Sequence, residues 1–169
     1  MNLHELNTLP KLKLREELLR CCGSDAWVEK VLPFFPVEDL VELLEDAEEQ
    51  WFKCTQAEWK EAFSHHPRIG DTDSLAKKFA ATSEWAAGEQ KAVSNAPRKI
   101  IEALAKGNQE YEKKFGYTFI VCATGLSAEE MLSMLEVRMQ NSPEVEIEVA
   151  ADEQSKITKL RIEKLLDTL

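Results

Sequence analysis

The chain has 169 residues, a length that suits one globular domain with a single hydrophobic core. Hydrophobic residues make up 44% and charged residues 31%, with only six glycines and six prolines, so the composition excludes a fibrous chain and argues against extensive disorder. The formal net charge of -10 disfavours nucleic acid and anionic membrane surfaces as partners, because both are negatively charged.

The first part of the chain predicts short helices separated by turns. We expect helices over 2–8, 11–21, 37–50 and 55–64, with a turn around Pro33 and Pro36. In the third of these helices, the apolar residues recur at i, i+3, i+4 and i+7, the spacing of a buried helix face. These residues are Val37, Leu40, Val41 and Leu44. The tryptophans are expected to pack in the core rather than to stack on a cofactor; they are Trp27, Trp51, Trp59 and Trp85.

The loop 65–71 interrupts this helical pattern, because Pro67 biases the residue before it away from the helical conformation and Gly70 permits a tight turn. Helical character resumes over 73–81 and 83–115. Residues 117–123 are rich in β-branched and aromatic side chains, which predicts an extended segment and makes it the best strand candidate.

Two helices are predicted after this segment. Ser127 followed by Glu130 is a capping box, which starts a helix over 128–140, and Ser142 with Pro143 offers an N-cap and a first-turn proline for a last helix. Residues 145–149 alternate with the period of a strand, but the run continues at helical spacing, so we favour a helix to the C-terminus. The prediction is an all-α fold, a single-domain helical bundle over 1–169 with one short extended segment around 117–123.

A cytoplasmic protein with reduced thiols is expected. No apolar run approaches the roughly 18 residues of a membrane helix, and neither a secretory signal nor a peroxisomal address is recognisable. The cysteines include no C-x-x-C pair and are too few for a disulfide framework. They are Cys21, Cys22, Cys54 and Cys122.

The adjacent histidines of the loop are the first candidates for chemistry. Loops that follow buried helices commonly carry catalytic groups, and imidazole titrates near neutrality, although packing alone would also explain His65 and His66. A metal site would use the two histidines with Asp71 and Asp73, but no metal-ligand spacing is present, so no metal is predicted. Nucleotide-binding and nucleophile-elbow motifs are also absent from the sequence.

Arg161 and the pair Glu89 and Gln90 are further candidates. Arg161 lies four residues from both Ile157 and Leu165 on an apolar stripe, where it either extends its guanidinium to water or forms a fork that binds an anion. Glu89 and Gln90 are either a solvated pair or a carboxylate and an amide that bind the polar edge of a heterocycle.

Four motifs, in this order, resemble one known family. They are HHPRIGD at 65–71, EWAAGEQ at 84–90, YEKKFGYTFIVCATG at 111–125 and LRI at 160–162. Together they are similar to the 2-oxo-4-hydroxy-4-carboxy-5-ureidoimidazoline (OHCU) decarboxylases of urate degradation, over about 21–166.

This resemblance implies an all-helical, cofactor-independent homodimer that decarboxylates the small molecule OHCU to (S)-allantoin in urate and purine catabolism. By position it implies His66 and Glu89 as catalytic residues. The implied substrate-binding residues are Pro67, Gln90, Ile120, Val121, Cys122, Ala123 and Arg161. It assigns no role to His65.

The chain departs from the family pattern at two positions. Ala86 stands where some members carry a serine, and Leu126 replaces a basic residue often seen after the ATG motif. Two other classes of function stay open on the residues alone: a non-catalytic helical interaction module, and a metal-assisted amide hydrolase that uses His65, His66 and Asp71.

Overall fold

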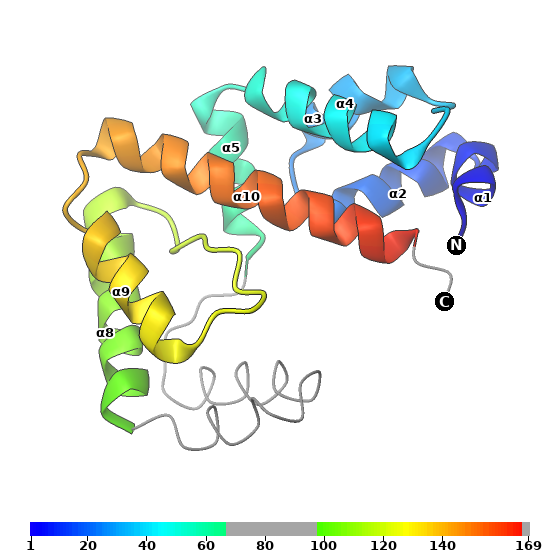
Figure 1. Ribbon diagram of the computed structural model, residues 1–169. Helices are drawn as coiled ribbons and strands as arrows, with labels where there is room; N and C mark the ends of the chain where they lie inside the picture. The colour runs from blue at the N-terminus through cyan, green and yellow to red at the C-terminus, as the bar shows by residue number, and fades with distance from the viewer. Residues whose placement is uncertain (67–97, 167–169) are drawn as a thin grey trace. The chain divides into compact units, whose positions relative to one another are not determined.

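The computed structural model describes residues 1–66 and 98–166, and in this part of the chain every regular element is a helix (Figure 1). The chain divides into two compact units, one made of residues 1–65 and 151–169 and the other of residues 66–150. The all-α prediction is confirmed, whereas the single-domain prediction stays a prediction. None of the described helices combines the length and apolar character needed to cross a membrane.

The first unit begins with short capped helices. In chain order they are α1 (Leu3–Thr8), α2 (Lys11–Cys21), α3 (Asp25–Val31), the 3-10 turn η1 (Leu32–Phe34), α4 (Leu40–Phe52) and α5 (Gln56–Ser64). Helices α1, α3, α4 and α5 each follow a side chain that accepts a hydrogen bond from a backbone N–H of the helix's first turn. These side chains belong to Asn2, Ser24, Asp39 and Thr55. These caps define where the helices start, because the first N–H groups of a helix have no partner within it.

Buried tryptophans hold the first unit together, as predicted. Trp27 and Trp51 are almost fully buried, and their indole N–H groups donate to the carbonyls of Ala47 and Ala151, at 2.9 Å in both cases. Trp59 is half-buried and donates to the carbonyl of Trp51 at 2.9 Å. These bonds satisfy the one polar atom of each ring inside an apolar core.

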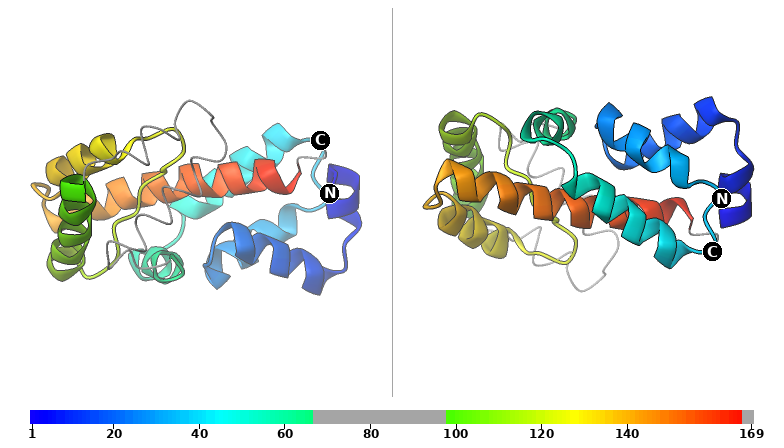
Figure 2. Two further views of the ribbon diagram at one scale, coloured as in Figure 1. Left: turned by 90° about the horizontal axis from the view of Figure 1, so that it is seen from below. Right: turned by 90° about the horizontal axis from the view of Figure 1, so that it is seen from above.

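The second unit contains α8 (Arg98–Phe115) and α9 (Ala128–Arg138), which pack side by side (Figures 1 and 2). Gly107 permits their close approach, since a β-carbon built at this position would lie 2.4 Å from Cδ2 of Leu135. Gly116 ends α8 with a φ of 87°, a left-handed conformation that favours glycine.

Helix α10 (Pro143–Leu165) is the last described element. Its residues 143–150 belong to the second unit and the remainder to the first. The N–H of Val145 donates to Ser142 Oγ at 3.3 Å, so the predicted cap forms, and the alternating run 145–149 is helical as favoured.

Two details of the predicted elements are wrong. Helix α3 was not expected, and the buried face of α4 is formed by Leu43, Ala47 and Trp51, whereas Val41 is 63% exposed. Helix α4 starts at Leu40, after its cap Asp39, so Val37 is buried but outside the helix, and Leu40 and Leu44 are half-buried at the edge of the buried face. The predicted helices over 73–81 and 83–97 lie outside the described residues.

Candidate functional site

His66 follows helix α5, as the sequence predicts. Helix α5 ends at Ser64, His65 is its C-cap, and His66 comes next with a half-buried side chain. The helix ends here because the following proline disfavours the helical conformation at His66. The structure therefore places an imidazole at the exit of a packed helix.

Three of the predicted site residues, Pro67, Glu89 and Gln90, lie outside the described residues. Asp71, Asp73 and Ala86, which the sequence also singles out, lie outside them as well. Within the described ranges, no group of three or more histidine, cysteine, aspartate or glutamate side chains is placed to hold a metal ion.

Residues 117–123 connect α8 to α9 as an extended segment without strand pairing in the described part of the chain. Phe119, Ile120 and Val121 are 5%, 1% and 8% exposed, whereas Cys122 and Ala123 are half-buried. These fractions count backbone as well as side-chain atoms, so Cys122 and Ala123 provide most of the accessible surface of residues 119–123.

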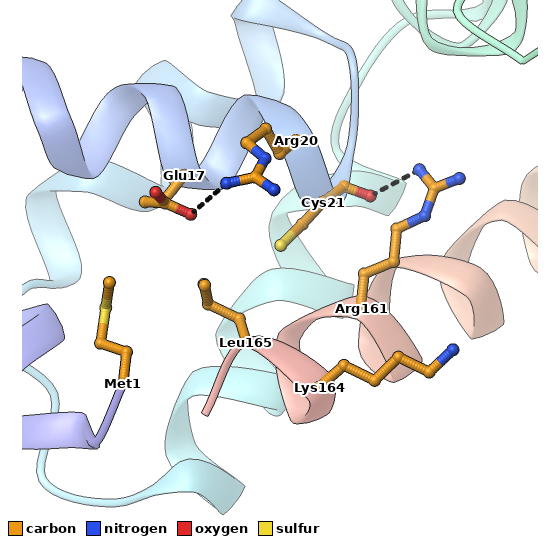
Figure 3. A pocket seen from close by; sticks show the side chains of 7 residues that line it. All are labelled: Met1, Glu17, Arg20, Cys21, Arg161, Lys164 and Leu165. Carbon is orange, nitrogen blue, oxygen red and sulfur yellow. Dashed lines mark hydrogen bonds and ion pairs between the residues drawn. The ribbon is translucent and has the colours of Figure 1, made fainter. Parts of the chain in front are cut away.

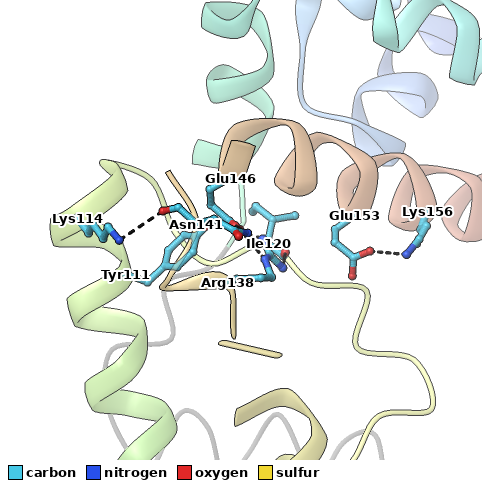
Figure 4. A network of polar contacts seen from close by, with 8 residues as sticks. All are labelled: Tyr111, Lys114, Ile120, Arg138, Asn141, Glu146, Glu153 and Lys156. Carbon is cyan, nitrogen blue, oxygen red and sulfur yellow. Dashed lines mark hydrogen bonds and ion pairs between the residues drawn. The ribbon is translucent and has the colours of Figure 1, made fainter. Parts of the chain in front are cut away.

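A buried ion pair lies directly against this segment (Figure 4). Arg138 Nε donates to Glu146 Oε1 at 2.5 Å, and the two side chains are 6% and 0% exposed. Arg138 Nη1 donates to the Ile120 carbonyl at 2.6 Å, and its guanidinium carbon lies 4.4 Å from the centre of the Phe119 ring. One arginine thus contacts two consecutive residues of the segment.

Further hydrogen bonds complete the surroundings of Glu146. Its Oε1 also accepts from the Tyr111 hydroxyl at 3.0 Å, and its Oε2 accepts from Asn141 Nδ2 at 3.3 Å. Burial raises the pKa of Tyr111 above its ordinary value, which keeps the hydroxyl protonated as a donor. No motif in the sequence indicates this network, although Arg138 falls at helical spacing after the buried residues Met131 and Leu135.

Arg161 lies in the first unit, on the wall of a hollow of about 580 Å³ (Figure 3). The described residues that line it with Arg161 are Met1, Glu17, Arg20, Cys21, Lys164 and Leu165. Arg161 Nη1 donates to the Cys21 carbonyl at the end of α2, at 3.3 Å. A helix C-terminus carries partial negative charge, so a cation is favourable there.

Arg161 lies on a half-buried stripe of α10. The side chain is half-buried, as are Ile157 and Leu165 on the same stripe, and its guanidinium is held at one N–H by a backbone carbonyl. Among the described residues no other acceptor bonds the guanidinium, which has five N–H donors. A fixed cation with donors remaining can bind an oxygen of an anionic ligand.

The thiol of Cys21, beside Arg161, is not set up as a nucleophile. Burial raises its pKa to about 11, and the positive charge of Arg161 opposes this shift only in part. Cys22 is fully buried, and its pKa is raised to about 12 for the same reason. Thiols of this kind stay protonated near neutral pH and serve as packing residues, as predicted.

Comparison with known sequences identifies relatives in urate degradation. The chain is 39% identical over 146 residues to the uric acid degradation bifunctional protein TTL of Arabidopsis thaliana, which covers 86% of this chain and 45% of that protein. It is 31% identical over 106 residues to the 2-oxo-4-hydroxy-4-carboxy-5-ureidoimidazoline decarboxylase of Amia calva, which covers 60% of this chain and 57% of that protein. The chain spans about half the length of these two curated relatives.

Comparison with solved structures gives the same fold. A crystal structure of OHCU decarboxylase in the presence of (S)-allantoin matches with a TM-score of 0.72 and 38% identity, and covers 89% of this chain and 96% of that chain. A crystal structure of (S)-allantoin synthase, 19% identical, has the same fold with a TM-score of 0.72. The sequence model of the OHCU decarboxylase family matches residues 7–163. The chain therefore belongs to the OHCU decarboxylase family.

Proposed function

We propose that the protein decarboxylates OHCU to (S)-allantoin without a cofactor. The observation that carries this proposal is family membership over residues 7–163, together with 38% identity to an OHCU decarboxylase whose crystal structure was obtained in the presence of (S)-allantoin. Two described groups, each taken by itself, suit this chemistry: the imidazole of His66 after α5, and the guanidinium of Arg161 bonded to the Cys21 carbonyl.

The substrate explains why no cofactor is needed. When the bond to the carboxylate breaks and CO2 leaves, an electron pair stays on the ring carbon. The adjacent C=N bond of the OHCU ring takes up this pair and passes the charge to nitrogen and the ring carbonyl beyond it, which is the task that pyridoxal phosphate or thiamine performs in other decarboxylases. A proton added to one face of the neighbouring, ureido-bearing carbon, while the hydroxyl on the decarboxylated carbon loses its proton and becomes a ring carbonyl, then gives a single enantiomer of allantoin.

His66 supplies that proton in this proposal, because a group that titrates near neutrality donates and accepts protons efficiently. Glu89 holds the imidazole or contacts the substrate hydroxyl, and Gln90 fixes the ureido edge. Pro67 and the backbone of 120–123 line the substrate. The proposal requires all of these groups to reach one substrate molecule.

Arg161 binds a ring oxygen of the substrate, where negative charge develops as CO2 leaves. A guanidinium that gripped the departing carboxylate instead would stabilise the ground state and slow the reaction. The half-buried position of Arg161 and its bond to the Cys21 carbonyl support a role for a pre-oriented cation.

The test is the circular dichroism of freshly oxidised urate during incubation with the protein. Wild type should form one enantiomer of allantoin faster than the spontaneous, racemic decay. His66→Ala should lower the rate by about 10²-fold or more, because general acid catalysis contributes on that order. His4→Ala, which removes an exposed imidazole on α1, is the matched control and should keep full activity.

The same assay separates the other classes of function. Wild type without any chiral excess would refute the decarboxylase and favour an interaction module, and stoichiometric zinc with inhibition by chelators would favour a metal-assisted hydrolase. Full activity of His66→Ala would refute only the role given to His66. We also propose a cytoplasmic homodimer, which light scattering of the purified protein and localisation of a tagged chain would test.

A further inference from the structure

The conformation of residues 120–123, in the extended segment 117–123, depends on the groups that contact this segment. Within the described part of the chain it has no strand pairing. A ligand that forms hydrogen bonds with backbone N–H and carbonyl groups binds well only if these groups are already held within a few tenths of an ångström of their positions in the complex. Side chains that contact the segment therefore affect how well it binds a ligand.

Arg138 is placed to do this from the protein side. Its guanidinium lies over the Phe119 ring at 4.4 Å and donates to the carbonyl of the next residue, Ile120, at 2.6 Å. Both contacts come from one planar group, so they fix the ring and the adjacent peptide relative to each other. The peptide that follows this carbonyl carries the N–H of Val121.

The guanidinium is in turn fixed by its burial. Arg138 and Glu146 are 6% and 0% exposed, and a buried charge is stable only when its partners stay in place. Glu146 is anchored in addition by Tyr111 and Asn141, so the carboxylate cannot follow a moving arginine at low cost. Rotation of Arg138 away from Ile120 would break its bond to Glu146.

We propose that Arg138 is a positioning residue for substrate binding, which holds the backbone of Ile120 and Val121 and thereby keeps the more accessible Cys122 and Ala123 in the conformation that binds OHCU. This inference rests on the proposed function, and it adds a residue that contacts the segment at Phe119 and Ile120. Arg138 has no contact with substrate in this role. It acts through the Ile120 carbonyl and the Phe119 ring.

The test compares Arg138→Lys with Tyr111→Phe. A lysine keeps the positive charge for Glu146, but its single ammonium group cannot stack on Phe119 and bond both partners with the fork geometry of arginine. Tyr111→Phe removes a different donor to the same carboxylate and an acceptor of Arg138 Nη2 at 3.4 Å, but leaves the bond of Arg138 to the Ile120 carbonyl in place. It is the matched control for a general loosening of the network.

For Arg138→Lys, we expect the KM for OHCU to rise about tenfold while kcat changes less than about twofold. Hydrogen exchange of the backbone amides at 119–123 should become at least about tenfold faster. Tyr111→Phe should leave KM and these exchange rates close to wild type, even where it lowers the melting temperature. If Arg138→Lys does not fold, Arg138→Gln combined with Glu146→Gln removes both buried charges together and should give the same rise in KM.

An unchanged KM in a folded Arg138 variant would overturn the inference and leave the decarboxylase proposal intact. An equal rise of KM in Tyr111→Phe would also overturn it, because the effect would then reflect the stability of the whole network. Wild type without chiral activity would instead refute the proposed function, and with it the role of the segment in substrate binding.

Discussion

Gly23 occupies a position where no larger side chain fits. A β-carbon built there would lie 2.6 Å from Cγ of His65, 2.7 Å from its Cδ2 and 2.9 Å from its Cβ. One of these atoms is Cβ of His65, which does not move when the side chain rotates, so a change of rotamer would not relieve the overlap. The backbone at residue 65 would have to move, and His66 is the next residue in the chain.

Gly23→Ala should therefore impair catalysis through His66. We expect the rate of chiral allantoin formation to fall at least about tenfold, and the free energy of unfolding to fall by about 1–3 kcal/mol, as is usual for overpacking. Circular dichroism assays and urea unfolding measure the two effects. Adding His65→Gly to this variant removes the overlap and should restore most of the activity; a lack of rescue would show that Gly23 acts in some other way.

At the residue scale, the sequence predicts a role more readily when it depends on local spacing than when it depends on partners distant in the chain. The end of α5 before His66 follows from Pro67, and Arg161 stands out as a cation on an apolar stripe. Arg138 has the same signal relative to Met131 and Leu135, but its role depends on Glu146 and on the Ile120 carbonyl. These partners are distant in sequence, and no spacing rule connects them.

At the scale of elements, the packing of α8 against α9 depends on Gly107. The position would receive a β-carbon 2.4 Å from Leu135, whose side chain is 1% exposed and has little room to move. We expect Gly107→Val to lower the free energy of unfolding by about 1–3 kcal/mol in urea titrations. Lys106→Val places the same side chain on the adjacent, exposed position and should change it by no more than about 0.5 kcal/mol. Equal effects of the two changes would argue against the packing explanation.

Helix ends were predictable where a single side chain caps them. Ser127 accepts from the N–H of Glu130 at 3.1 Å, and Thr55 forms a full capping box with Glu58. Helix α3 was missed because its seven residues are too few for a periodic pattern, even though Ser24 caps it. The extended segment was predicted from its β-branched and aromatic residues, but sequence alone does not show that it lacks a strand partner.

At the scale of the whole molecule, the two-unit division could not be predicted. One boundary falls between His65 and His66 and the other inside α10, between Ala150 and Ala151. The sequence shows no change in composition and no linker rich in Gly, Ser or Pro at either place, because packing between residues distant in sequence defines the units. Urate-degrading relatives at 38–39% identity place the chain in a family, but these boundaries follow from the folded structure alone.

Buried acids make the protein sensitive to alkaline pH. Burial raises the pKa of Cys22 to about 12 and the pKa values of Cys21 and Cys54 to about 11, from an ordinary value of 9.0. In the unfolded chain these thiols ionise above pH 9, whereas in the native state they stay protonated. Their contribution to the free energy of unfolding is therefore fully present below pH 9 and is lost as the pH rises toward 12. For Cys22 alone, we expect a loss of about 1–2 kcal/mol between pH 8 and pH 10.5. Urea titrations at both pH values measure it, and Cys22→Ala should show a smaller loss.

The placement of the tryptophans gives the two units different optical signals. Trp27, Trp51 and Trp59 all lie in residues 1–65, and their indole N–H groups bond to carbonyls of the same unit. After Trp85→Phe, intrinsic fluorescence therefore reports on this unit alone, while ellipticity at 222 nm follows all helices. Coincident denaturation curves from the two probes would mark one cooperative domain, and separated midpoints would mean that each unit melts independently.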